Sequence, residues 1–330
     1  MNAIRKVFVA GPASAARQAI VRRLMASGFV ADQIDTWDES DHSLYDQAAV
    51  RSYLRDSTPD HIYVAVGPWG NPSDNSSRRG TYMGDALLGP VQLIHEAMYA
   101  GVRKLLFIAS HQVYGGCPVL PMAEEDLAFA RPDRAREPLA IAHMAGIRLC
   151  EAYTHEFGEL LGLTYRSVVV GNLYGPGDDL QPSTAGELLT LMRHIHQAKT
   201  FKLSSVNLRC NGFRRADWLY VDDMAEACIG LLDLPDRSYR LLTDERRPHV
   251  NLGSGRASTT LELAQAVAKV VGYRGCLNVD GDVADEGADF YLDTHRMRST
   301  GWAPQIELET GLAHMYRDYR QQEQRLAAAS

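Results

Sequence analysis

The sequence predicts an α/β protein whose first half is a doubly wound parallel sheet. Short, continuously apolar strands at Val7–Ala10, 62–66 and 105–109 alternate with segments of helical pattern. Strands without polar alternation are typical of parallel sheets covered by helices on both faces. Because crossovers between parallel strands are right-handed, this alternation produces helices on both sides of one sheet.

The remaining elements follow in sequence order. Helices are expected over 14–26, through Val50 and Leu54, and over 81–100, 138–157 and 185–198, with strands over 165–170 and 201–203. Gly84, Gly89 and Pro90 should bend or interrupt the helix over 81–100.

The second half shows a looser pattern. The segment 218–221 and a helix from Asp222 are expected to return to the main sheet. Thr259 or Thr260 should cap a helix through Val271, with Glu262 placed for a capping box. A charged helix is expected from about Leu308. We therefore predict a dinucleotide-binding-type domain over 1–175 and a smaller domain over 176–330, with 216–258 partly rejoining the main sheet.

Composition limits the classes of function. The net charge of −7 argues against nucleic-acid binding and against a membrane-surface role, since both need a dominant basic patch. No apolar run is long enough to span a membrane. The five cysteines are scattered without metal-ligand spacing, so we expect reduced thiols, a cytoplasmic location and no metal site.

Ligands of doubly wound sheets bind at the carboxyl ends of the strands, here the segments 11–17, 35–41, 65–72, 110–117 and 170–178. Ser110, His111, Tyr114 and His143 are the candidate catalytic residues, because two histidines near one crevice could perform acid–base chemistry without hydride transfer. His194 and His196 lie two apart on a predicted helix and so face different sides, which makes a metal site improbable.

Several ordered strings extend this interpretation. They include KLLFIAS at 104–110, PMAEEDL at 121–127, AGIRLCEAY at 145–153, NLYGPGD at 172–178, VDDMAEA at 221–227 and VNLGSG at 250–255. Together they resemble the GDP-L-fucose synthase group of the NAD-dependent epimerase/dehydratase family, within the extended short-chain dehydrogenases/reductases. The resemblance implies a Rossmann domain for NADP(H), a smaller C-terminal domain for a nucleotide sugar, and usually a dimer.

The chain departs from that family at its chemical positions. The family's Tyr-x-x-x-Lys pair becomes Leu139 and His143, and its epimerisation Cys and His become Gln112 and Gly186. Leucine, glutamine and glycine cannot transfer a proton. In the phosphate loop the glycines of Gly-x-x-Gly-x-x-Gly become Gly11, Ser14 and Arg17. Arg17 should be hard to accommodate at a packing position unless the helix tilts or the side chain escapes to solvent.

The resemblance also implies binding positions. Those for a dinucleotide are Gly11, Ala13, Ser14, Ala15, Trp37, Asp38, Ala65, Val66, His143 and Val170. Those on the substrate side are Gln112, Leu139, Asn172, Arg209 and Arg215. Trp37 replaces the family's phosphate-binding arginine and is flanked by Asp35 and Asp38, so any dinucleotide should be NAD(H) rather than NADP(H). The family's basic Pro-Arg-Lys stretch becomes Ala288-Asp289-Phe290.

These losses leave two hypotheses. In the first, the chain is a non-reductase binding or regulatory subunit associated with nucleotide-sugar or related biosynthesis, which could have a protein partner in a biosynthetic complex. In the second, it is an epimerase, isomerase or lyase acting on a sugar or carbonyl compound with histidines in place of the Tyr/Lys pair. Either way, the apolar faces of helices 91–99 and 141–153 are expected to form a homodimer interface.

Overall fold

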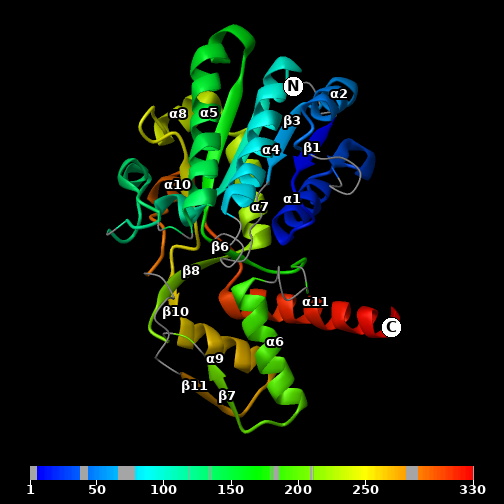
Figure 1. Cartoon of the computed structure of the whole chain (residues 1–330), viewed down its shortest axis with the longest axis vertical. Helices are drawn as coiled ribbons and strands as arrows, with labels where there is room; N and C mark the ends of the chain where they lie inside the picture. Colours follow the sequence, from blue (N-terminus) through cyan, green and yellow to red (C-terminus); the bar gives the residue numbers. More distant parts are fainter. Residues whose placement is uncertain are drawn as a thin grey trace.

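The structure is a computed structural model. It describes residues 6–37, 44–65, 79–117, 119–132, 134, 136–178, 180, 186–208, 210, 212–279 and 289–329, and the statements below concern these residues. Figure 1 shows two lobes, a larger one built on a central sheet and a smaller one below it. No helix of the described residues is long and apolar enough to cross a membrane.

The large lobe contains a parallel sheet of six strands within the described residues, in the order β2-β1-β3-β4-β5-β9. The strands are β1 (Val7–Ala10), β2 (Ile34–Thr36), β3 (His61–Val64), β4 (Lys104–Ser110), β5 (Thr164–Val170) and β9 (Val250–Leu252). All five neighbouring pairs run parallel. The strand order reverses at β1, and the carboxyl ends of the strands there form the crevice in which such folds bind ligands. The predicted fold class is confirmed.

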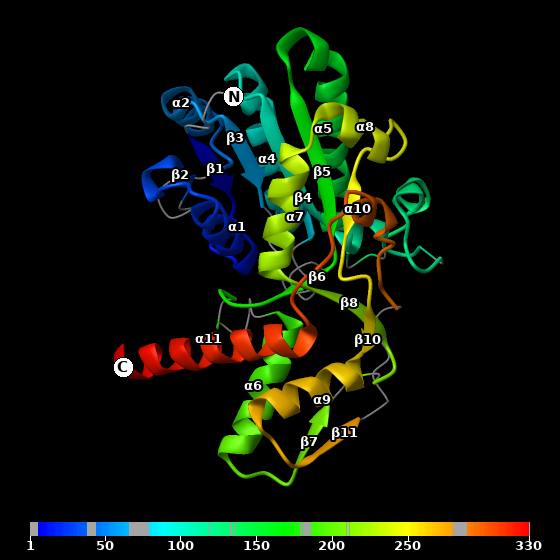
Figure 2. The same cartoon turned by 180° about the vertical axis from the view of Figure 1, so that it is seen from behind.

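Helices cover both faces of this sheet. Helices α1, α7 and α8 lie on the face seen in Figure 2, and α2, α4 and α5 lie on the face seen in Figure 1. Their bounds are α1 (Ala15–Ala26), α2 (Gln47–Ser57), α4 (Arg79–Tyr99), α5 (Glu137–Leu161), α7 (Val221–Asp233) and α8 (Asp236–Leu242). Along β1, Val7 and Val9 enter the core beneath α1, while Phe8 and Ala10 enter the core on the other face. Burial on both faces explains why the strands are continuously apolar.

The small lobe packs three helices, α6 (Glu187–Thr200), α9 (Thr260–Val271) and α11 (Leu308–Ala329), around their own apolar core. Two small sheets accompany them. One has the order β10-β8-β6, from β6 (Asn172–Tyr174), β8 (Arg215–Tyr220) and β10 (Ala257–Thr259); the other pairs β7 (Ser205–Leu208) with β11 (Cys276–Val279). The short helices are η1 (Ala31–Gln33), η2 (His111–Tyr114), η3 (Glu124–Phe129) and α10 (His295–Ser299).

Two of the predicted helices, α1 and α9, begin at a side-chain cap. The Ser14 side chain caps α1 by accepting from the backbone N–H of Arg17. Thr259 caps α9, and Glu262 completes the capping box by accepting from the N–H of Thr259. These caps satisfy backbone N–H groups that have no partner within the helix. The expected C-terminal helix begins at Leu308.

Two expectations were wrong. Residues 201–203 are not a strand: Phe201 ends α6, Lys202 has a positive φ of 53°, and the strand begins at Ser205. The segment 218–221 does not return to the main sheet, because β8 pairs with β6 and β10, whereas the following helix α7 packs on the main sheet as expected. Helix α4, expected to be bent or interrupted near Pro90, is not interrupted there.

Candidate functional site

The loop after β1 retains the geometry of a phosphate-binding turn. Gly11 has a φ of 134°, a conformation that favours glycine, and Ser14 begins α1 three residues later. Ala15 is buried in the helix–sheet contact and Ala13 is exposed at the crevice. The first N–H groups of the helix have no carbonyl partner within it and, with the helix dipole, favour an anion.

Arg17 folds back across this loop rather than escaping to solvent. Its Nη1 donates to the carbonyl oxygen of Gly11 at 2.8 Å and to that of Trp37 at 2.9 Å. Gly11 follows β1 and Trp37 follows β2, so one guanidinium nitrogen links the carboxyl ends of two adjacent strands. The Trp37 ring is buried and packs against Phe8 and Tyr53, with centroids 6.0 and 4.8 Å away.

These features fit a dinucleotide. A pyrophosphate could approach the glycine turn and accept hydrogen bonds from the N-terminus of α1. The adenosine half of a dinucleotide would then lie near the cation between the first two strand ends. Ala65 follows β3 and Val170 ends β5 at the same edge of the sheet, both buried. Asp38 and Val66 lie outside the described residues.

The carboxyl end of β4 carries the candidate acid–base groups. Ser110 ends the strand, and its hydroxyl accepts from the N–H of Gln112 to cap η2. The N–H of Ser110 donates to Nδ1 of His143 on α5 at 2.8 Å. Because Nδ1 accepts, a neutral His143 carries its proton on Nε2. The His143 ring is fully buried and stands edge-on to Phe107.

Leu139 lies one turn before His143, in the place the resemblance gives to the proton-donating tyrosine. It is 1% exposed and packs in a cluster with Tyr82, Ala86 and Ala142. The cluster joins α4 to α5 and fills this place with apolar contacts. Tyr82, which carries a phenol into the cluster, was not identified from the sequence, because no local pattern distinguishes it from a core tyrosine.

His111 and Gln112 begin η2 and face a different environment. The His111 ring lies on Phe290, with centroids 3.7 Å apart. Burial, together with the positive charges of Arg136 and Arg214, lowers the pKa of His111 to about 3. Nδ1 of His111 and Oε1 of Gln112 are both buried without a hydrogen-bond partner among the described residues. Such orphaned polar atoms are costly unless a ligand or water satisfies them.

Tyr114 points away from this group. Its hydroxyl donates to Oδ1 of Asn251 at 2.7 Å and contacts Nε2 of His249 at 2.5 Å, inside the protein. The backbone N–H of Asn251 in turn donates to Oε1 of Glu124 at 2.9 Å. Of the four candidate catalytic residues, Ser110 and His143 are hydrogen-bonded to each other, and His111 follows Ser110 in the chain. Tyr114 instead belongs to a buried polar network with His249 and Asn251.

The substrate-side candidates are dispersed. Asn172 begins β6 and is partly buried, and Gly186 precedes α6. Arg215 begins β8 and is exposed, with its backbone N–H donating to Asp289 at 2.9 Å. Arg209 lies outside the described residues. Sequence reasoning missed Arg136, which occupies the N-cap position of α5 without a side-chain capping bond; its place directly before Glu137-Pro138 was the available signal.

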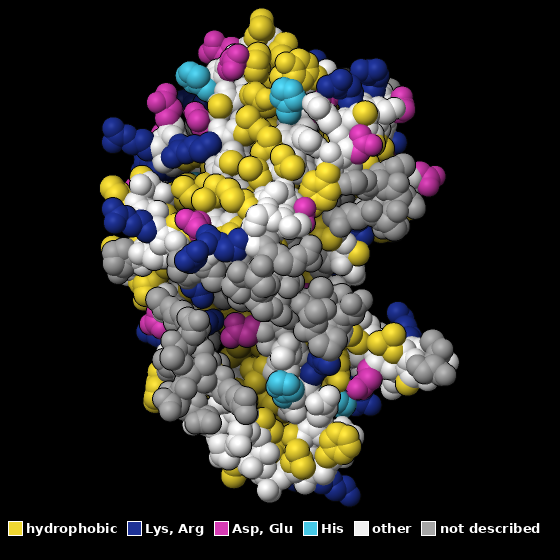
Figure 3. Space-filling view, viewed as in Figure 1, with side chains coloured by type: hydrophobic (Ala, Val, Ile, Leu, Met, Phe, Trp, Pro, Cys, Tyr) yellow, Lys and Arg dark blue, Asp and Glu magenta, His cyan; other side chains and the backbone are white. Residues whose placement is uncertain are grey.

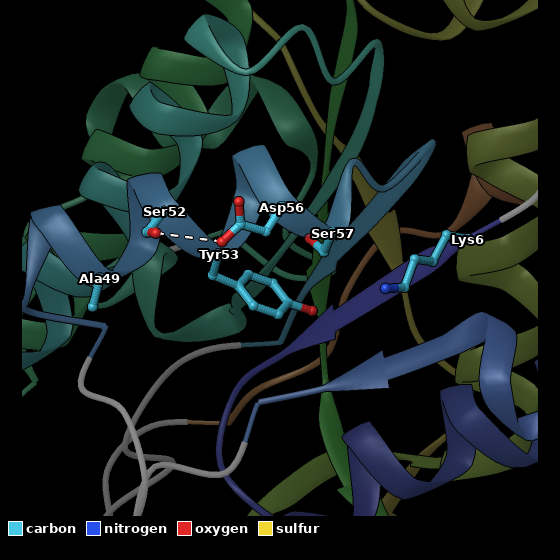
Figure 4. A pocket seen from close by; sticks show the side chains of 6 residues that line it. All are labelled: Lys6, Ala49, Ser52, Tyr53, Asp56 and Ser57. Carbon is cyan, nitrogen blue, oxygen red and sulfur yellow. Dashed lines mark hydrogen bonds between the residues drawn. The ribbon is translucent and has the colours of Figure 1, made fainter.

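A separate surface pocket of about 470 Å³ lies at the opposite end of β1, next to Lys6 (Figure 4). Figure 4 shows the Lys6 ammonium and the Tyr53 hydroxyl pointing toward one another across it. Both groups contact Asp35 of β2, at 2.9 Å each. Asp35, expected beside a ribose, is therefore engaged at this other edge. The described residues contain no group of three or more His, Cys, Asp or Glu side chains that could hold a metal.

Comparison with known proteins gives consistent matches over most of the chain. The model of the NAD dependent epimerase/dehydratase family matches residues 7–253. GDP-L-fucose synthase of Escherichia coli is 34% identical over 321 residues, covering 97% of this chain and 98% of that protein. GDP-L-fucose synthase 1 of Arabidopsis thaliana is 34% identical over 94% of this chain and 92% of its own length.

Solved structures agree in fold. A GDP-D-glycero-L-gluco-heptose synthase from Campylobacter jejuni, determined in the presence of NADPH, has a TM-score of 0.86 at 24% identity, covering 97% of this chain and 99% of that one. A UDP-glucose 4-epimerase from Thermotoga maritima, with UDP-glucose, has a TM-score of 0.78 at 19% identity over 96% and 99%. At these identities the likeness concerns the fold.

Proposed function

We propose that this chain, which belongs to the NAD dependent epimerase/dehydratase family, binds a nucleotide sugar without reducing it. In this role the chain is a binding or regulatory subunit in biosynthesis related to nucleotide sugars. The family resemblance predicted from the sequence is confirmed, and the similarity to GDP-L-fucose synthases supports a GDP-sugar as the ligand. The departure from catalysis is our inference from the site.

The environment of Leu139 carries the proposal. A reductase of this type needs a proton donor beside the reacting carbonyl, and a leucine side chain has no proton to give. Leu139 is packed against Tyr82, Ala86 and Ala142, so the place is filled by side chains of α4 and α5 rather than left open for a substituted acid. A site built for hydride transfer would lack its acid here.

The histidines do not supply a substitute acid. His143 is fully buried, and its Nδ1 is held by the N–H of Ser110. His111, with a pKa of about 3, is neutral near pH 7 and a weak base. The alternative of a histidine-based isomerase or lyase needs groups that exchange protons near neutral pH. This geometry supports the binding role better.

The same site retains features of a binding surface. Oε1 of Gln112 and Nδ1 of His111 are orphaned at the carboxyl end of β4. The positive charges of Arg136 and Arg214 help to lower the pKa of His111, after burial as the main cause, so both act on this side of the site. Sugar hydroxyls could donate to the orphaned atoms, and a diphosphate would be complementary to the arginines.

We further propose a homodimer in the cytoplasm. Figure 3 shows apolar side chains gathered on the face formed by α4 and α5. Leu88 and Tyr99 of α4 and Ile141 of α5 are 50%, 70% and 38% exposed. Exposed apolar surface on paired helices is a candidate for burial between subunits. All five cysteines, each of them described, are outside disulfides, as expected in a reducing compartment. A protein partner in a biosynthetic complex could use the same face.

The test compares hydride transfer with binding. The purified wild-type protein, given NADPH and a GDP-4-keto sugar, should show no NADPH oxidation above background, while calorimetry with GDP-sugars should show binding. E. coli GDP-L-fucose synthase serves as the positive control. Turnover by the wild-type protein, or absence of GDP-sugar binding, would overturn the proposal.

A matched pair of double variants sharpens the result. Leu139→Tyr with His143→Lys restores the family's pair, and Leu139→Phe with His143→Lys adds the same ring without the hydroxyl. If the missing phenol is the cause of inactivity, only the tyrosine variant should gain NADPH oxidation. Equal activity of both variants would contradict this explanation.

A further inference from the structure

Nδ1 of His111 is a buried polar atom without a hydrogen-bond partner among the described residues. We infer that the nucleotide sugar in this site presents a hydroxyl to that atom, so that the chain takes a reduced sugar in preference to a keto sugar. The inference rests on the proposed binding of a nucleotide sugar and names the class of sugar that the site accepts. Because Leu139 has no proton to give, a carbonyl reduction by another protein must supply this ligand.

His111 lies at the edge of the sheet where a ligand is expected. It is the first residue of η2 and follows Ser110, the last residue of β4. Doubly wound folds bind their ligands outside the carboxyl ends of the strands. The residue as a whole is only partly buried, and the Phe290 ring contacts a face of the imidazole, with centroids 3.7 Å apart. The lone pair of a ring nitrogen points along the ring plane instead, so a bound group that approaches the edge of the ring can reach it.

The rest of the imidazole determines that Nδ1 accepts. Burial, with the charges of Arg136 and Arg214, lowers the pKa of His111 to about 3, so the ring is neutral near pH 7. A hydrogen bond to the backbone of Val170 acts on the pKa in the opposite direction, as expected of a carbonyl oxygen that accepts from a ring N–H. Because Nδ1 has no partner, that N–H is on Nε2. A neutral imidazole carries one N–H, so Nδ1 is left with a lone pair and no proton.

An acceptor in this place distinguishes among the groups that a sugar can carry. A hydroxyl donates a hydrogen bond to Nδ1, whereas a carbonyl oxygen has no hydrogen and would leave the nitrogen unsatisfied. An ammonium group could donate, but the positive charges that act on His111 disfavour a further cation. An unsatisfied buried acceptor is costly, so a sugar with a carbonyl here would bind more weakly. A hydroxyl is therefore the sugar substituent that fits.

The neighbouring Gln112 does not impose this preference. Its Oε1 is also buried without a partner, but an amide carries two N–H donors beside its oxygen. The terminal torsion of a glutamine is soft, so the amide can turn either group toward a ligand. The discrimination between a hydroxyl and a carbonyl is thus assigned to His111.

The test compares GDP-sugars that differ only at carbon 4. GDP-6-deoxymannose and its C4 epimer, GDP-6-deoxytalose, carry a hydroxyl there, and GDP-4-keto-6-deoxymannose carries a carbonyl. Their affinities for the full-length protein are measured by calorimetry without any dinucleotide, so that the keto sugar is not reduced. His111→Phe keeps an aromatic ring against Phe290 and removes the acceptor, whereas His111→Asn keeps a side-chain acceptor. The matched control is His155→Phe, at an exposed position of α5.

We expect the wild type and His155→Phe to bind at least one of the hydroxyl sugars about tenfold or more tighter than the keto sugar. His111→Phe should abolish this ratio, and His111→Asn should retain part of it. The ratio within one variant is insensitive to a general loss of stability.

Equal or tighter binding of the keto sugar by the wild type would overturn the inference, as would a ratio that survives in His111→Phe. Either result would leave the proposed binding of a nucleotide sugar standing. Failure of all three GDP-sugars to bind would instead overturn the proposed function, and the inference with it.

Discussion

The imidazole of His111 lies on the ring of Phe290, with centroids 3.7 Å apart and planes inclined by 32°. The two residues come from segments 179 positions apart in the chain, as the difference of their numbers shows (290 − 111). Phe290 stands in the stretch where related sequences are expected to be basic, and His111 stands next to Gln112, which is expected in place of the family's epimerisation cysteine. Two positions at which the sequence is expected to depart from the family pattern are thus in contact.

Gln112→Leu should separate stability from binding. Oε1 of Gln112 is buried without a partner, so replacing the amide by an apolar side chain should leave the ligand-free protein as stable or more stable, by up to about 1 kcal/mol. GDP-sugar binding should weaken, because a hydrogen-bond acceptor is lost. Urea denaturation and calorimetry measure the two effects. Unchanged affinity would show that this carbonyl does not meet the ligand.

Tyr114→Phe should lower stability and leave ligand binding unchanged. Removing the hydroxyl leaves Oδ1 of Asn251 and Nε2 of His249 without their partner in a fully buried network, which typically costs about 1–3 kcal/mol. The matched control is Tyr99→Phe, whose side chain is 70% exposed and should change the free energy of unfolding little. A tenfold loss of GDP-sugar affinity in Tyr114→Phe would instead return Tyr114 to the binding site.

Stability should fall as the pH drops below about 6.5. Burial is the main cause that lowers the pKa of His61 to about 4 and of His249 to about 3, while the unfolded chain protonates near 6.5. The unfolded state then binds more protons, so each histidine contributes stability that is complete above 6.5 and is lost as the pH falls toward the folded pKa, by up to about 1.4 kcal/mol per pH unit.

Replacing one histidine separates its contribution to the pH dependence of stability from the contribution of the buried acids. Glu124 and Asp217, whose pKa values burial raises, act in the opposite direction. The difference in unfolding free energy between wild type and His61→Asn, measured by urea denaturation from pH 7.5 to 4.5, should therefore shrink as the pH falls. A difference that is constant over this range would contradict the lowered pKa of His61.

Charge on the α4–α5 face should prevent self-association. Leu88→Glu with Ile141→Glu places one carboxylate at an exposed position of each of α4 and α5, and burying both in a dimer would be costly. Sedimentation should show a wild-type dimer and a monomeric variant. Leu241→Glu on α8, where the leucine is 83% exposed, is the matched control and should remain dimeric. A wild-type monomer would refute the homodimer and direct the search to another protein partner.

Local chemistry made much of the fold predictable. Continuous apolar runs marked β1, β3 and β4, since a strand buried on both faces carries no polar alternation. A side-chain cap with its capping box marked the start of α9, because a hydroxyl three residues before a free N–H is a local arrangement. The expectation that Leu139 stands in place of the family's phenol also came from the sequence alone.

Only the tertiary structure decided which distant groups meet. The apolar segment 218–221 was visible, but its pairing with β6 joins residues 46 positions apart, Asn172 with Trp218 (218 − 172). The preceding residues of β8 pair with β10 on the other side. The sequence could not show that Tyr114 contacts His249 in a buried network. Nor could it show that Asp35 contacts the side chains of Lys6 and Tyr53. Arg17 appeared in the sequence as a packing problem and proved to be held by two carbonyls. Periodicity and capping act over a few residues, whereas side-chain partners are set by how the whole chain folds.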